Sequence, residues 1–80
     1  MCSLFGLIDF KECLSTHTKN KILNILAREC QVRGTDATGI AYNFNDHLQI
    51  YKRPIPARKM KIHIPHSVNV VMGHTRMTTQ

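Results

Sequence analysis

The sequence predicts a small α+β domain in which antiparallel strands pack with one main helix, from about Lys19 to Val32. Three observations predict it. An apolar run opens the chain at residues 4–8, an apolar stripe at helical spacing follows, and two alternating segments flank Asn45-Asp46. With 80 residues, the chain is long enough for one small domain, spanning residues 1–80.

The first expected strand is the run Leu-Phe-Gly-Leu-Ile at residues 4–8. The run is short, continuous and apolar, without the alternation of a half-buried strand. It therefore predicts a strand that is buried on both faces.

The expected helix has one apolar stripe, because its apolar residues recur at steps of three and four. Before the helix, Ser15, Thr16 and Thr18 offer N-cap side chains, and Gly34 suits the left-handed position after its end. The stripe consists of Ile22, Leu23, Leu26, Ala27 and Cys30.

A β-hairpin is expected from residues 38–44 and 47–53, because Asn45 and Asp46 both tolerate the positive φ of a tight turn. This turn pairs Phe44 with His47, Ala41 with Ile50, and Ile40 with Tyr51. One face of the first strand carries Gly39, Ala41 and Asn43 and is nearly bare, so that a ligand or another backbone can approach it closely.

After the hairpin, the prolines at 54 and 56 end the strand, since proline cannot donate to a ladder. Residues 57–62 fit a short helical turn. Residues 68–72 form a last strand that runs into Gly73-His74-Thr75-Arg76. The order β-α-β-β-β is typical of an α+β layered fold.

Composition excludes several classes of protein. No apolar run reaches the ~18 residues of a membrane span, and no basic segment precedes a long apolar one, which favours a cytoplasmic protein. The three cysteines match no short zinc-ligand pair. The net charge of +6 is compatible with phosphorylated ligands, with nucleic acid or with solubility alone.

Cys2 stands directly behind the initiator methionine. If Met1 is removed, one residue carries both a thiol and an α-amine, whose pKa of roughly 7.7–8.0 lets it act as a base near neutral pH. This is the logic of N-terminal nucleophile catalysis. By position alone, the simpler interpretation is that Cys2 is a small apolar residue that opens a strand.

Three motifs occur in a fixed order along the chain. Together they resemble the class II glutamine amidotransferase domain of the N-terminal nucleophile hydrolases, which opens on a cysteine and continues with Arg-Gly-x-Asp-x-x-Gly and His-Thr-Arg-x-x-Thr. Here the motifs read Cys2-Ser3-Leu4-Phe5-Gly6, then Arg33-Gly34-Thr35-Asp36-Ala37-Thr38-Gly39, and then His74-Thr75-Arg76-Met77-Thr78-Thr79. The resemblance implies an αββα sandwich, of which these 80 residues are the N-terminal portion.

By this resemblance, Cys2 is the nucleophile and its freed α-amine is the general base. Arg76 binds the α-carboxylate of glutamine, for which a guanidinium forms a bidentate pair, and Thr79 adds a hydroxyl. The site-shaping residues are Arg33, Gly34, Asp36 and His74, the last expected in a hydrogen bond near the strand end.

The implied reaction is hydrolysis of the side-chain amide of L-glutamine through a γ-glutamyl thioester. The ammonia passes to a synthase domain or subunit, whose product this sequence does not identify. The resemblance implies no metal and no organic cofactor, and the lack of a long apolar run predicts no membrane partner.

Two departures from the family pattern bear on activity. Ser3 replaces the usual glycine, and the sequence has no Asn-Gly pair, which supplies the oxyanion donor in the family. Loss of one oxyanion donor costs about 10²–10³ in rate, so the 80 residues alone are expected to have negligible glutaminase turnover. A portion of the sandwich also leaves apolar sheet surface uncovered, which predicts marginal stability or a homo-oligomer unless further sequence covers it.

Three alternatives stay open at this point. One is a basic module for phosphate or nucleic acid, based on Tyr51-Lys52-Arg53, on the run from Arg58 to His63, and on His66. Nucleic acid is disfavoured because aromatic residues are only 6% of the chain, which is few for base stacking. The others are a non-catalytic domain of the same fold and an N-terminal nucleophile hydrolase that cleaves another amide.

Overall fold

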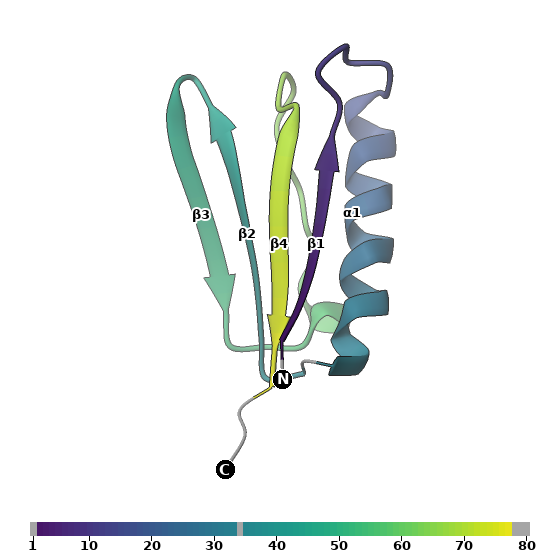
Figure 1. The fold of residues 1–80 in the computed structure, drawn as a ribbon, viewed down its shortest axis with the longest axis vertical. Coiled ribbons are helices and arrows are strands. Elements are labelled where there is room, and N and C mark those ends of the chain that lie inside the picture. Colours follow the sequence, from purple (N-terminus) through teal and green to yellow (C-terminus); the bar gives the residue numbers. More distant parts are fainter. Residues whose placement is uncertain (1, 34, 78–80) are drawn as a thin grey trace.

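The structure is a computed structural model that describes residues 2–33 and 35–77. One sheet and one helix form two layers (Figure 1). The described elements are β1 (Cys2–Ile8), α1 (Thr16–Cys30), the 3₁₀ helix η1 (Gln31–Arg33), β2 (Ala37–Phe44), β3 (His47–Arg53), the 3₁₀ helix η2 (Ala57–Lys59) and β4 (Val70–Arg76). The predicted α+β class and order of elements are therefore confirmed.

The four strands form one antiparallel sheet in the order β1-β4-β2-β3. The last strand of the chain thus lies between the first strand and the hairpin (Figure 1). The hairpin has the expected register, with Phe44 opposite His47 and Ile40 opposite Tyr51. Its turn residues Asn45 and Asp46 have φ values of 52° and 62°, as a two-residue turn of this kind requires.

Helix α1 begins three residues earlier than predicted, because Ser15 is the N-cap. The Ser15 hydroxyl accepts a hydrogen bond from the Thr18 N–H at 3.1 Å and so satisfies one of the unpaired amides of the first turn. The helix ends at Cys30, and the chain continues directly into η1. The position predicted for the terminating glycine, Gly34, lies outside the described residues.

The predicted apolar stripe of α1 packs against one face of the sheet. Leu23 and Ala27 are fully buried, and the other three stripe residues, including Cys30, are partly buried against the same core. The core also contains Phe5 and Val71 from the sheet. The residues that precede β4 complete it, with Met60, Ile62, Ile64 and Val68 buried.

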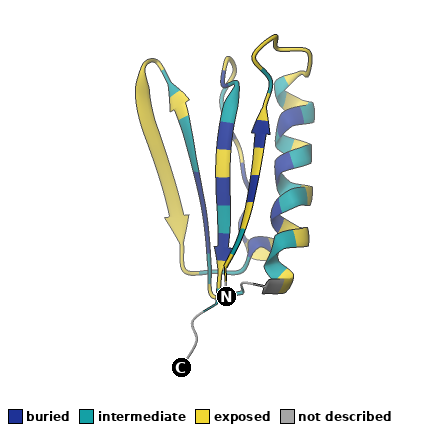
Figure 2. Ribbon diagram, viewed as in Figure 1, coloured by how far each residue is buried: buried dark blue, intermediate teal, exposed yellow. Residues whose placement is uncertain are grey.

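The opposite face of the sheet is uncovered in the described structure, and this corrects one prediction. Strand β1 alternates between exposed and buried residues instead of being buried on both faces (Figure 2). Leu4 is 73% exposed and Ile8 66%, whereas Phe5 and Leu7 face α1. A continuous apolar run does not reveal whether an element covers each side of the strand. We call the uncovered face of the sheet, which carries Leu4 and Ile8, the open face.

A buried ion pair holds the loop between β1 and α1. The Lys19 ammonium lies 3.4 Å from the Asp9 carboxylate and donates to the Val68 carbonyl at 2.9 Å. The Asp9 carboxylate also accepts from the Leu14 and Cys13 amides. The Leu14 amide contributes most to holding the pKa of the Asp9 carboxyl below its usual value, and together with the Cys13 amide and Lys19 it outweighs burial.

The extended segment 60–64 runs beside α1, joined to it by two asparagine side chains. Asn24 accepts from the Ile62 N–H at 2.9 Å and donates to the Ile62 carbonyl at 2.8 Å. Asn20 makes the same pair of bonds to Ile64, at 2.6 and 3.3 Å. The helical turn expected over 57–62 is limited to η2, since the residues after Lys59 are extended along the helix.

Candidate functional site

The structure brings the predicted nucleophile and the predicted carboxylate-binding residue together. Cys2, the first residue of β1, lies directly opposite Arg76, the last residue of β4. The same arginine lies opposite Ala37, the first residue of β2, so that one row crosses three strands at the same end of the sheet. Residues opposite each other in such a row share a face and have Cα atoms about 4.5–5.5 Å apart.

Both side chains of this pair belong to the open face. The alternation that turns Phe5 and Thr75 toward α1 turns Cys2 and Arg76 to the other side. Both residues are exposed, and the thiol of Cys2 is free. A ligand approaching from the open side can therefore contact both of them.

Hydrogen bonds fix the position of the strand end that carries Arg76. The Asp36 N–H donates to the Arg76 carbonyl at 2.8 Å, which aligns the start of β2 with the end of β4. The buried Thr75 hydroxyl donates to the Cys30 carbonyl at 2.8 Å and connects β4 to the end of α1. The η1 turn contacts both β1 and β4. The predicted site-shaping segment thus supports the pair through its backbone.

His74 lies one row further along the open face, opposite both Leu4 and Gly39. Its imidazole packs over Gly39, where a β-carbon would come within 3.0 Å of the ring. The hydrogen bond expected of His74 is not present within the described part of the chain. The bare strand face predicted at Gly39 therefore accommodates the histidine ring.

An apolar groove of about 260 Å³ lies on the open face next to this pair. Gly39 and Ala41 of β2 form its floor, and side chains from the other three strands form its walls, among them Leu4, Ile50, Lys52, Met72 and His74. The floor was predictable from the small residues of β2. The walls could not be predicted, because they depend on which strands are neighbours.

For several predicted site residues, the structure gives the backbone position only, or the residue lies outside the described part of the chain. Arg33 is placed in η1 by its backbone, whereas Gly34 and Thr79 lie outside the described residues. The Asp36 backbone is placed next to Arg76. The pair Cys2–Arg76, with His74 beside it, is thus the part of the predicted site that the structure brings together.

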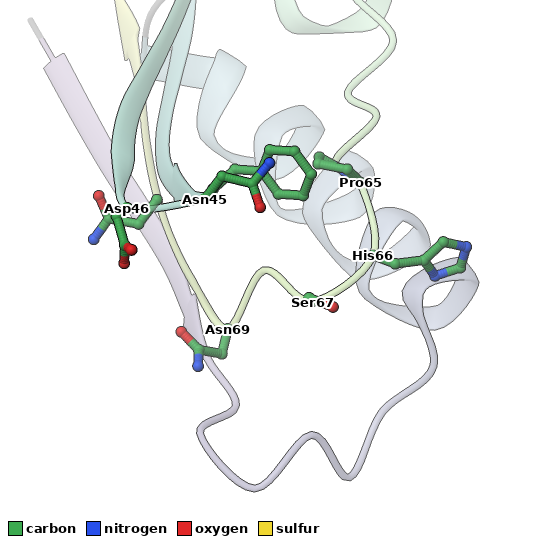
Figure 3. A pocket seen from close by; sticks show the side chains of 8 residues that line it. Asn45, Asp46, Pro65, His66, Ser67 and Asn69 are labelled. Atoms are coloured by element: carbon green, nitrogen blue, oxygen red, sulfur yellow. The ribbon is translucent and has the colours of Figure 1, made fainter.

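A larger cavity, of about 740 Å³, lies at the other end of the sheet, between the hairpin turn and residues 65–69 (Figure 3). Its polar side chains do not converge. His66 points toward α1, where it forms a 2.7 Å hydrogen bond with Thr16, and Asp46 points to the opposite side (Figure 3). This end of β2 is about 20 Å from Ala37, given the strand rise per residue. The cavity is therefore separate from the Cys2–Arg76 pair.

The described residues contain neither a metal-binding cluster nor a membrane-spanning helix. Among residues 2–33 and 35–77, no group of three or more histidine, cysteine or acidic side chains is arranged to hold a metal ion. The helix in this part of the chain is too short and too polar to cross a membrane. Comparison of the chain with protein-family models, with curated proteins and with solved structures found no match.

Proposed function

We propose that this chain carries the nucleophile and the substrate clamp of a class II glutamine amidotransferase. The observation that supports the proposal best is the placement of Cys2 directly opposite Arg76 on the open face. Residues at positions 2 and 76 meet because β4 pairs with β1, and the resemblance between motifs did not by itself require this contact.

Glutamine is a short substrate, and both groups that the pair would contact lie close together in it. The α-carboxylate carbon and the side-chain amide carbon of glutamine are separated by four carbon–carbon bonds, about 5 Å when extended. Because the Cα atoms of opposed residues in an antiparallel pair lie about 4.5–5.5 Å apart, the two side chains start close enough for one substrate molecule to contact both. With its carboxylate in the fork of Arg76, the substrate can present its amide carbon to Cys2.

The proposed hydrolysis of glutamine then follows from the thiol and the α-amine of Cys2. After removal of Met1, the free α-amine takes the thiol proton, and the sulfur attacks the amide carbon of glutamine. The C–N bond breaks, the proton moves to the leaving nitrogen, and ammonia departs from a γ-glutamyl thioester. Water attacks the thioester, the C–S bond breaks, and glutamate leaves with the thiol restored. Arg76 holds the substrate in position throughout these steps.

In this proposal, the open face receives the second sheet of an αββα sandwich. The support is the number of large apolar side chains on that face, which no described element covers. Leu4, Ile8, Leu48, Ile50 and Met72 are each more than half exposed. Scattered apolar residues are ordinary on a surface, but a contiguous set on one sheet face indicates an interface.

The proposal is tested by labelling with 6-diazo-5-oxo-L-norleucine, an electrophilic analogue of glutamine. We expect a single adduct on Cys2 in protein that lacks Met1, found by peptide mass mapping, with protection by L-glutamine and not by D-glutamine. Arg76→Ala is expected to slow this labelling at least tenfold while reaction of Cys2 with iodoacetamide is unchanged, because the arginine binds the analogue and does not activate the thiol.

Cys13 provides a matched control, since it is also a free, exposed cysteine. Cys13→Ala should leave labelling by the analogue unchanged, whereas Cys2→Ala should abolish it. Equal labelling of the two cysteines, or labelling of Cys2 that is indifferent to Arg76→Ala, would refute the proposal.

A further inference from the structure

A second surface, beside α1, carries a basic groove. Two adjoining cavities, of about 550 and 470 Å³, lie between α1 and residues 57–66 and share Lys21, Asn24 and Lys61. They therefore form one continuous groove along the helix. From His17 to Arg28 its length is about 16 Å, at the rise of an α-helix.

Five cationic side chains line one half of the groove, and all of them are exposed. Two come from α1 and three from the segment on the opposite wall, so residues distant in sequence are concentrated here. They are Lys21, Arg28, Arg58, Lys59 and Lys61. None of the five acidic residues of the chain lines either cavity. Like charges on facing walls repel one another, so binding of an anion between them is favourable.

The walls of the groove are held at a fixed separation. The paired hydrogen bonds of Asn20 and Asn24 join the extended segment to α1, and the Gln31 side chain accepts from the Arg58 N–H at 2.9 Å. Because Ile62 is buried toward the core, its neighbours Lys61 and His63 are turned outward. The cations are thus arranged before any ligand binds, which reduces the entropy cost of binding.

We infer that this groove binds a linear polyphosphate. Along α1, the cations extend from Lys21 to Arg28, about 10 Å at the rise of an α-helix, which is more than a single phosphate spans, so a ligand that contacts all of them carries several anionic groups in a row. Lysine, which supplies three of the five cations, binds phosphate as a point charge, and the two arginines can bind phosphate in bidentate pairs. No phenylalanine, tyrosine or tryptophan lines the described groove, so it lacks the stacking surface, worth about 1–3 kcal/mol per base, that favours single-stranded nucleic acid.

Binding of short-chain inorganic polyphosphate to the full chain, measured by fluorescence anisotropy or calorimetry, tests this inference. If five cations each displace counterions, the logarithm of the affinity should fall with the logarithm of salt concentration with a slope of about −3.5. Between 50 and 200 mM salt, the affinity should then fall about 100-fold.

The variant Lys21→Glu/Lys61→Glu reverses one charge on each wall and should weaken binding at least tenfold. Lys11→Glu/Arg53→Glu changes the net charge equally at exposed sites outside the groove, and it should keep the affinity within about twofold. Circular dichroism of both variants verifies that they fold. Equal losses in the two variants would overturn the inference, because net charge alone would then explain binding.

Two competing ligands test which class of anion the groove prefers. Oligo-dT and poly-glutamate of matched charge should both bind more weakly than polyphosphate. Tighter binding of either one would overturn the assignment and identify the groove as a nucleic-acid or acidic-peptide surface. None of these residues belongs to the Cys2–Arg76 pair, so the two proposals stand or fall separately.

Discussion

Phe5 and Gly73 lie directly opposite each other on β1 and β4, and the ring of Phe5 occupies the space that a β-carbon on Gly73 would fill. Gly73→Ala should therefore destabilise the protein by about 1–3 kcal/mol, the usual cost of overpacking a core. Denaturant unfolding measures the loss.

The variant Phe5→Leu provides the control for this steric conflict. In the Phe5→Leu background, Gly73→Ala should cost clearly less than in the wild type, because the smaller side chain vacates the position. Strictly additive effects of the two substitutions would show that the ring is not the source of the conflict.

The hairpin turn offers a stabilising substitution. Asp46 has a φ of 62°, a conformation that glycine adopts without the steric cost of a β-carbon. Asp46→Gly should raise stability by about 0.5 kcal/mol, or the melting temperature by about 2–4 °C. Asp46→Ala should lower it, since alanine lacks the local hydrogen bonding that helps aspartate tolerate this region. A lower melting temperature for Asp46→Gly than for Asp46→Ala would contradict the described turn.

The Asp9 carboxylate makes stability dependent on pH. Its folded-state pKa lies below the ordinary value of about 3.9 because the Leu14 and Cys13 amides and the Lys19 ammonium stabilise its charge. The stabilisation is therefore present above that value and is lost as pH falls through the folded-state pKa. In Asp9→Asn, we expect lower stability at neutral pH and a smaller decrease on acidification.

Chemical unfolding between pH 2 and pH 7 compares the two proteins. Their free energies of unfolding should converge toward the acid end. Curves that stay parallel across this range would show that the Asp9 charge does not contribute to folding.

Apolar side chains on the open face should make the isolated 80-residue chain self-associate. Ile50 and Met72 are 61% and 54% exposed there, and contact between two such faces removes apolar area from water. Ile50→Lys/Met72→Lys should shift the protein toward monomer in analytical ultracentrifugation. The control Val32→Lys also replaces an exposed apolar residue, 78% exposed in η1, and should leave association unchanged. A monodisperse wild-type monomer that melts cooperatively would contradict the prediction.

Local signals in the sequence predicted most of the elements. The register of the hairpin followed from Asn45-Asp46, because a two-residue turn fixes which residues face each other. The helix followed from its apolar stripe and from Ser15. The hairpin register and the helix depend on residues that are close together in the sequence, so they could be predicted from local sequence patterns.

Long-range pairing was not predictable in the same way. Nothing local indicates that β4 lies between β1 and β2, and the adjacency of Cys2 and Arg76 depends on that order. For the same reason, the sequence could not show that β1 has one uncovered face. In the sequence, Asn20 and Asn24 also resembled ordinary polar positions of a helix. A polar side chain that bonds to a distant backbone recurs at the same spacing as one that faces water, so the pattern does not distinguish the two.

The bonds that Asn20 and Asn24 make to Ile64 and Ile62 have a consequence for local opening. The Ile62 and Ile64 amides belong to no strand, yet each donates to a side chain of α1 instead of to water. Their hydrogen–deuterium exchange should be as slow as that of the helix, because neither amide is released until α1 moves or unwinds. Segment 60–64 and α1 should therefore open as one cooperative unit, although the bonded residues are 38 and 44 positions apart in the chain.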